Sequence, residues 1–354
     1  MKKTKKYFMN LILFIALIVL TFSIIFKDQD VSEIFKIVRS VKLEFILIGI
    51  IFMSLYMVCE AINIGRTLKA LNEKSTFLKN LKYALIGFFF SSITPAASGG
   101  QPMQIYYMHK EKISVASSTL ALLINLTCIQ IVTISVALVS LIFNYQYMNK
   151  FLIGFFILGV SLNASALALL LISILSKKMT KGLINIVIKI LKFFKVKNIE
   201  SKQEKLEKEL KKYQDSADYI KENKKLILKN LITTYIQYFA YYSISYCVYR
   251  SFGLSSHSVL KIATMQAVLY ATVSGIPSPG AVGVSEGGYL AIFETIYPKN
   301  MLNGAMLLNR GINFYLFVII SAIVVMINAL KTKTEYKKPL TQETLEEISN
   351  EGYK

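Results

Sequence analysis

Two clusters of proline, glycine and small polar residues interrupt the apolar stretches of this sequence. The first break spans residues 91–102 (SSITPAASGGQP), and the second break spans residues 274–288 (SGIPSPGAVGVSEGG). Both run from proline through small residues and glycine to a polar residue that starts the next helix. Non-helical backbone at membrane depth lines a wet cavity or is buried in protein. A helix that begins there directs free N–H groups at an anion such as phosphate. Two kinked helices with tight glycine packing are the structural alternative.

The predicted binding site combines these breaks with polar residues near the second one. Its members are Pro95, Ser98, Gly99, Gly100 and Gln101, then Pro279, Gly280, Gly283, Glu286, Asn309 and Arg310. Arg310 would hold a phosphate through its forked guanidinium, or would extend to the outer interface. Glu286 would receive a cationic headgroup, pair with Arg310 or cap the helix that begins beside it. No catalytic residue, metal or cofactor is predicted, because two histidines and three isolated cysteines give no ligand pattern.

Other polar residues in apolar surroundings are assigned structural positions. Glu60 precedes Arg66 by six residues, and we expect it at the inner interface with a local partner. Tyrosines recur at helical spacing over residues 235–249. They are expected to pack or to form an interfacial belt, with stacking on a lipid headgroup as the lesser alternative.

Composition places these residues in a membrane protein. The 354 residues are 54% hydrophobic. The 41 basic residues outnumber the 21 acidic ones, and they stand in blocks between apolar runs. That pattern is typical of cytoplasmic loops, and the scarcity of arginine argues against a nucleic-acid binder. The apolar runs, each near or above the roughly 20 residues of a span, are 7–26, 43–65, 83–98, 115–143, 151–175, 228–250, 258–277 and 304–330.

The basic loops indicate on which side of the membrane the segments that contain the two breaks begin and end. Residues 66–82 and 176–229 are both basic and are expected in the cytoplasm. Two full spans already lie between them, so residues 83–112 must return to the side they left. The same count makes residues 258–298 return from the opposite face, as in an inverted repeat. The prediction is an all-α polytopic membrane protein with about six full spans and two re-entrant or broken hairpins, or about eight spans if the hairpins count as crossings.

The expected organisation is one transmembrane domain with basic appendages. Residues 1–330 form this domain, 176–229 a cytoplasmic amphipathic insert and 331–354 a cytoplasmic tail. The run 7–26 is expected as an uncleaved first span, which places both termini in the cytoplasm. Within the insert, apolar residues spaced by four and three predict a helix that packs locally. They are Leu210, Tyr213, Ala217 and Ile220.

Three motifs carry a family resemblance. They are TPAASGGQPMQIYY (94–107), IPSPGAVGVSEGGYLAIFE (276–294) and LLNRGINFY (307–315), in this order. With them the chain resembles the flippase-like transmembrane family, which is the membrane region of bacterial lysylphosphatidylglycerol synthase, or multiple peptide resistance factor. The resemblance covers about residues 7–330. The family more often has a Leu-Gly-Glu-type run where this chain has Ser98-Gly99-Gly100-Gln101, so no acidic residue is carried over into the first hairpin.

The resemblance implies that the protein binds and flips a modified phospholipid, lysyl-phosphatidylglycerol in the first place, in the bacterial plasma membrane. Resistance to cationic antimicrobial peptides is the implied physiology. An enzyme alternative is phosphatidylglycerol lysyltransferase, with lysyl-tRNA as partner. Relatives with that activity carry a soluble transferase domain, which we expect to be missing here, so a separate soluble synthase would be needed. A small-solute transporter that uses the same cavity is the third alternative.

Overall fold

The computed structural model describes Lys36 and residues 39–335, apart from gaps at 95–96, 146–147, 149, 179–180, 183–184, 186–187, 190–198 and 277. The predicted first span, Pro95 and all but the first residues of the tail lie outside this part of the chain. The described elements are α3 (Leu43–Ala70), α4 (Phe77–Ile93), α5 (Gly100–Lys110), α6 (Val115–Asn144), α7 (Lys150–Leu175), α9 (Ile199–Glu222), α10 (Lys224–Ser251), α11 (Val259–Val273), η3 (Pro279–Ala281), α12 (Val284–Phe293), α13 (Lys299–Arg310), η4 (Gly311–Tyr315) and α14 (Leu316–Glu335). All are helical, which confirms the all-α prediction for the described residues.

Four helical stretches are long and apolar enough to cross a membrane. They are α3, α6, α7 and the continuous stretch Lys299–Leu330, which α13, η4 and most of α14 form. Large apolar side chains such as Ile142 and Phe151 are exposed on α6 and α7, as expected for surfaces that face lipid. The helix α10 matches the predicted run 228–250, although its tyrosine, serine and threonine residues make it less apolar. The protein is therefore a multi-pass membrane protein.

The helices α3 and α10 run side by side in opposite directions. At one end the Lys42 N–H, just before α3, donates to the Ser251 carbonyl at 2.9 Å. At the other end Arg66 of α3 donates to the Asn230 side chain at 2.9 Å. The first helix of each hairpin packs against one member of this pair, α4 against α3 and α11 against α10.

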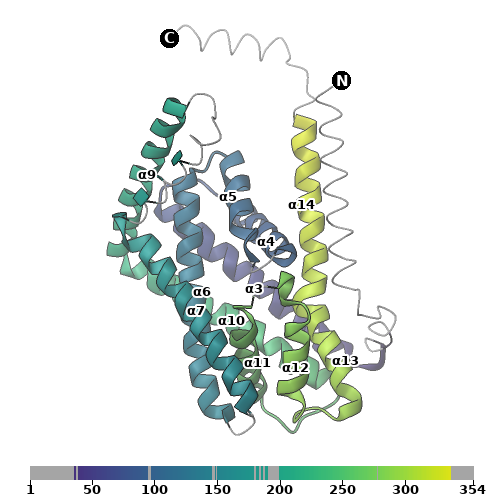
Figure 1. Ribbon diagram of the computed structural model, residues 1–354. Coiled ribbons are helices and arrows are strands. Elements are labelled where there is room, and N and C mark those ends of the chain that lie inside the picture. The colour runs from purple at the N-terminus through teal and green to yellow at the C-terminus, as the bar shows by residue number, and fades with distance from the viewer. Residues whose placement is uncertain are drawn as a thin grey trace.

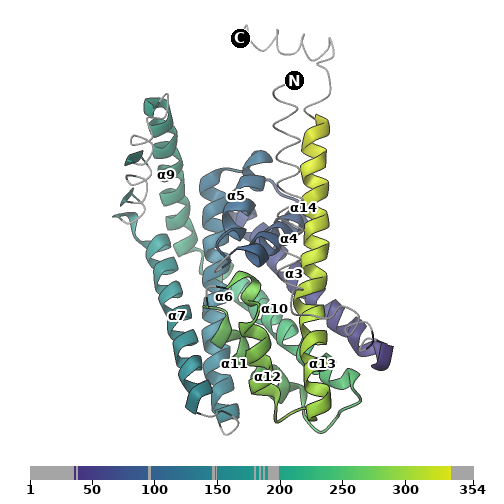
Figure 2. The ribbon, with the colours of Figure 1, turned by 45° about the vertical axis from the view of Figure 1, so that its right-hand side comes forward.

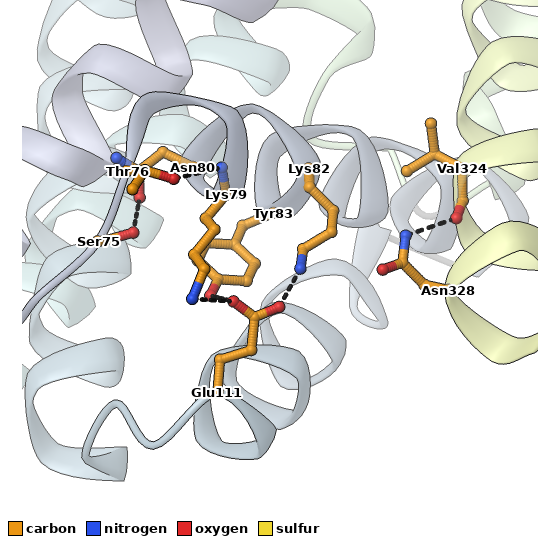
Figure 3. A network of polar contacts seen from close by, with 9 residues as sticks. All are labelled: Ser75, Thr76, Lys79, Asn80, Lys82, Tyr83, Glu111, Val324 and Asn328. Atoms are coloured by element: carbon orange, nitrogen blue, oxygen red, sulfur yellow. Dashed lines mark hydrogen bonds and ion pairs between the residues drawn. The ribbon is translucent and has the colours of Figure 1, made fainter. Parts of the chain in front are cut away.

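The first hairpin consists of α4 and α5, joined by the first break. The Glu111 carboxylate directly follows α5 and accepts hydrogen bonds from Lys82 and from the Tyr83 hydroxyl, at 2.8 Å for the latter. It also pairs with Lys79 at 3.1 Å (Figure 3). Since these three partners lie in the first turns of α4, the hairpin ends on the side where it began.

The second hairpin consists of α11 and α12, joined by the second break. Residues just before and just after it contact Tyr249, near the end of α10. The Tyr249 hydroxyl lies 2.8 Å from the Ser256 hydroxyl, and the Tyr249 and Tyr297 rings are 5.7 Å apart. The first hairpin follows the end of α3 and the second follows the end of the antiparallel α10, so they enter from opposite ends of the molecule (Figures 1 and 2). The prediction of two opposed hairpins agrees with this arrangement, which an inverted repeat produces.

The basic insert contains α9, which is docked against the transmembrane helices. Its apolar stripe, Tyr213, Ala217 and Ile220, is buried in one cluster with residues of α6. The Glu209 carboxylate accepts the Ala116 N–H at 2.8 Å, where α6 begins. The predicted local packing is confirmed for these three residues, whereas Leu210 of the predicted stripe is only half-buried.

A wide turn separates α13 from α14. In η4 the Leu316 N–H donates to the carbonyl of Gly311, five residues earlier, so this is a π-helical turn. Such turns occur mostly as single interruptions of α-helices, often at functional sites. Here the wide turn directly follows the buried Arg310.

Candidate functional site

Arg310 and Glu286 form a buried ion pair, with only 6% and 7% of their surfaces exposed. Arg310 Nε donates to Glu286 Oε1 at 2.8 Å. The second carboxylate oxygen accepts the Gly283 N–H at 2.7 Å, and the Tyr315 hydroxyl donates to Oε1 at 3.3 Å. Glu286 therefore caps α12 and neutralises Arg310 at the same time, so two of the roles considered for it coexist.

The same arginine holds the backbone of the second break. Pro279 opens the short turn η3, in which Gly280 has a φ of 58°, and Gly283 follows with a φ of 82°. Arg310 Nη2 donates to the Gly280 carbonyl at 3.0 Å. The guanidinium lies 4.1 Å from the centre of the Phe314 ring, a cation–π arrangement. These contacts bind the tip of the second hairpin to the last span.

Asn309 and Arg310 line a small pocket next to this ion pair. Its volume is about 20 Å³, which has room for a single water molecule but not for a headgroup. Asn309 is buried and accepts a hydrogen bond from the Ser245 hydroxyl at 3.1 Å. Tyr270 lines both this pocket and a much larger cavity.

The larger cavity has a volume of about 510 Å³ and lies between the two hairpins, α3, α6 and α7. The first break contributes Ser98 and Gln101, and the second hairpin contributes Tyr270 and Ser274. Ser98 and Gln101 are thus the predicted site residues that face this cavity. The other predicted residues of the second break and the last span lie outside its lining.

Gly99 and Gly100 shape the first break from behind the cavity. The Gly99 N–H donates to the Thr94 hydroxyl at 2.9 Å. A Cβ on Gly100 would lie 2.1 Å from the Ser91 hydroxyl and 2.8 Å from the Gly87 carbonyl. Glycine therefore lets the start of α5 approach α4 closely. This agrees with the structural alternative for the break, in which glycines allow tight helix packing.

The cavity joins a polar wall to an apolar one. The polar part includes Asn125, Gln130, Thr133 and Asn163. The apolar part includes Leu122, Leu126, Ile129, Leu169 and Leu170. Since Leu169 is 62% exposed, the cavity reaches the apolar outer surface at α7. Its volume falls in the range of pockets that hold small molecules, roughly 300–1,000 Å³.

Glu60 lines this cavity, although it is not among the predicted site residues. The expected local pairing with Arg66 is wrong, because Arg66 donates to Asn63, Asn230 and Thr233 instead. Two signals point to the site. Tyr56 and Glu60 are four residues apart, which places them on one face of α3. An ionisable residue within an apolar span is a functional candidate by default.

A cluster of tyrosines lies beside Glu60. Its rings, with centroid distances of 5.3 to 6.3 Å, belong to Tyr56, Tyr238, Tyr241, Tyr242 and Tyr270. The expected packing of the α10 tyrosines is confirmed for the three in this cluster. Tyr56, Tyr238 and Tyr270 also line the cavity.

Comparisons with known proteins cover the region that holds these features. The model of a family described as the lysylphosphatidylglycerol synthase TM region matches residues 9–321. A UPF0104 membrane protein of Pyrococcus horikoshii is 23% identical over 310 residues, which are 84% of this chain and 91% of that protein. A UPF0104 membrane protein of Archaeoglobus fulgidus is 19% identical over 313 residues, 88% of this chain and 94% of that protein. The family match includes both hairpins and the cavity between them, and the chain belongs to the family of the lysylphosphatidylglycerol synthase transmembrane region.

Proposed function

We propose that this protein binds a phospholipid and passes it from one leaflet of the membrane to the other. The cavity of about 510 Å³ between the two hairpins carries the proposal. Its polar wall suits a headgroup, and its leucine-rich side reaches the lipid-facing surface at α7, where acyl chains would remain in the bilayer. Two hairpins that enter from opposite ends give the symmetry expected for access from each leaflet in turn.

Family membership supports lysyl-phosphatidylglycerol or a related modified lipid as the cargo. In this proposal the protein lies in the bacterial plasma membrane with both termini in the cytoplasm. A separate soluble synthase, which consumes lysyl-tRNA, would supply the lipid. Exposure of the cationic lipid on the outer leaflet would repel cationic antimicrobial peptides.

Arg310 and Glu286 have a positioning role in this scheme. Their ion pair fixes the tip of the second hairpin against the last span, next to the cavity. Direct capture of a phosphate by Arg310 would require this pair to open. Ser98 and Gln101, in contrast, line the cavity, and they would touch a bound headgroup without any rearrangement of the protein.

The function is tested in cells with and without the gene. Total lysyl-phosphatidylglycerol is expected to stay constant, while the fraction accessible to an impermeant amine reagent on the outer leaflet falls without the gene. Complete loss of the lipid would assign synthesis to the protein. An unchanged accessible fraction would reject translocation of this lipid.

A pair of variants ties the activity to the cavity. Gln101→Leu removes a polar group from the cavity wall, and the accessible lipid is expected to fall to the level of cells that lack the gene. Gln203→Leu is the matched control on α9, away from the cavity, where the side chain donates to the nearby Glu207. Equal exposure of the lipid in the two variants would place the transport path elsewhere.

A further inference from the structure

The large cavity is acidic, although the chain as a whole carries a formal charge of +20. Of the described residues that line it, Glu60 is an acid and none is Lys, Arg or His. None of these basic side chains within the described part of the chain forms a salt bridge with Glu60. The Gln104 amide lies within hydrogen-bonding reach of Glu60, but an amide is neutral and supplies no positive charge to pair with a carboxylate.

Free hydrogen-bond acceptors surround the same space. The side-chain oxygens of Asn125 and Gln130 are buried and have no hydrogen-bond partner among the described residues. Both residues line the cavity. A buried acceptor without a donor costs about 1–3 kcal/mol, so these oxygens are suited to a guest that brings N–H or O–H groups.

Aromatic rings complete the lining next to Glu60. Tyr56 lies one helical turn before it, and Tyr270 lines the same cavity. The Tyr238 and Tyr270 hydroxyls lie 3.1 Å apart, which fixes the positions of both rings. Aromatic rings and a carboxylate together attract an ammonium group, which donates three hydrogen bonds and has no acceptor.

We propose that this cavity is a binding site for the ammonium group of the cargo, with Glu60 as its counter-ion. Tyr56, Tyr238 and Tyr270 would contact the cation, and the free oxygens of Asn125 and Gln130 would accept its protons. The inference rests on the proposed function for the claim that the ammonium belongs to a lipid headgroup. A free amine is the other source of the same chemistry. Selection of cargo thus depends on the amine of the headgroup, which unmodified phosphatidylglycerol lacks.

Binding to the purified full-length protein in detergent micelles tests this site. The probes are phosphatidylglycerol, its lysyl ester and lysine methyl ester as a free amine. Wild-type protein is expected to bind the lysyl lipid about tenfold or more tightly than phosphatidylglycerol, since charge-assisted hydrogen bonds contribute about 1.5–3 kcal/mol. Glu60→Gln should reduce this preference to about twofold or less and leave the affinity for phosphatidylglycerol unchanged, because the amide lacks the charge.

Matched variants distinguish a loss of ammonium binding from a loss of protein stability. Glu294→Gln removes an acid at an exposed position near the end of the second hairpin and should bind both lipids like the wild type. Glu60→Asp keeps the charge and should keep most of the preference. If Glu60→Gln does not fold, Gln130→Met provides the test, because it removes one free acceptor and should weaken binding of the lysyl lipid alone.

Each outcome has a distinct meaning. Equal binding of both lipids by wild-type protein, or a preference that survives in Glu60→Gln, would overturn the ammonium site and leave lipid binding in place. Binding of lysine methyl ester alone, lost in Glu60→Gln, would support the site and overturn the proposed function in favour of a soluble amine. Absence of binding by all three probes would overturn both.

Discussion

A buried arginine in an apolar protein requires a partner for its charge, and Arg310 has Glu286. The carboxylate accepts hydrogen bonds from Arg310, Gly283 and Tyr315 together, so the pair belongs to a local network and not to an isolated contact. Breaking a buried pair by removing one partner is more costly than removing both, because a lone charge stays behind. The coupling between these two residues is therefore measurable.

Arg310→Met is expected to lower the free energy of unfolding by about 3–5 kcal/mol, because Glu286 keeps its charge in a buried position. The double variant Arg310→Met with Glu286→Gln should lose less than the sum of the two single variants, by about 1–3 kcal/mol. Denaturant unfolding in detergent measures both quantities. Strict additivity would show that the pair is not coupled. Lipid exposure should be lost in each single variant that still inserts into the membrane.

The two glycines near the start of α12 provide a controlled test of backbone strain. Gly283 has a φ of 82°, whereas Gly287 lies within the helix, and a Cβ at either position would meet open space. Gly283→Ala should therefore cost about 1–3 kcal/mol from conformation alone. Gly287→Ala should be neutral or stabilise the helix by up to about 1 kcal/mol. Thermal unfolding in detergent compares them, and equal effects would contradict the positive φ at Gly283.

At the scale of elements, Glu111 closes the first hairpin at its base (Figure 3). Burial alone would raise the pKa of this carboxyl, but hydrogen bonds from Lys82, Tyr83 and Lys79 outweigh it and hold the pKa below its ordinary value. Because the pKa of Glu111 is depressed in the folded state, its stabilisation is present above the unfolded pKa of about 4.3. That stabilisation is lost as the pH falls through the folded value.

Acidification should therefore open the base of the first hairpin. Between neutral pH and about pH 3 the wild type should lose more thermal stability than Glu111→Gln, which lacks the titrating group. Melting temperatures in detergent across this range measure the difference. Parallel curves for the two proteins would show that Glu111 contributes no pH-dependent stability.

On the scale of the whole molecule, the antiparallel α3 and α10 impose opposite directions on the two hairpins. The end of α6 and the beginning of α7 lie at the opposite end of the molecule from the docked α9 (Figures 1 and 2). Positive charge in the insert predicts that α9 faces the cytoplasm. The orientation of the molecule in the membrane can be measured at these two places.

Single cysteines at exposed positions report this orientation. Tyr145→Cys is expected to react with an impermeant maleimide in intact cells, and Lys208→Cys only after the cells are permeabilised. Tyr145 is 62% exposed and the Lys208 side chain 76%, so both sites are accessible to the reagent. The three natural cysteines are buried and can be replaced beforehand. The reverse labelling pattern would invert the proposed topology.

The sequence predicted the hairpins but not the acidic side of the cavity. The basic segments 66–82 and 176–229 indicate which segments must enter the membrane and return to the same side. This information is contained in short stretches of the sequence. The short separation of Glu60 from Arg66 in the sequence predicts a local partner for this carboxylate. Six residues of α-helix, however, turn a side chain by about 240°, which points the two away from each other. Asn125 and Tyr270 line the same cavity as Glu60 because helices distant in sequence pack together, which a single sequence does not reveal.

The wide turn η4 accommodates one extra residue within the register of the last span. It holds one residue more than an α-helical turn, and it spreads nearly the same rotation over that larger number of residues. Deleting one residue there would let the segment close as an ordinary α-helical turn, with α13 and α14 kept close to their present orientation. Elsewhere in α14 the same deletion would rotate all following side chains by about 100°. Single deletions in η4 should therefore disturb the packing of the last span less than single deletions within α14.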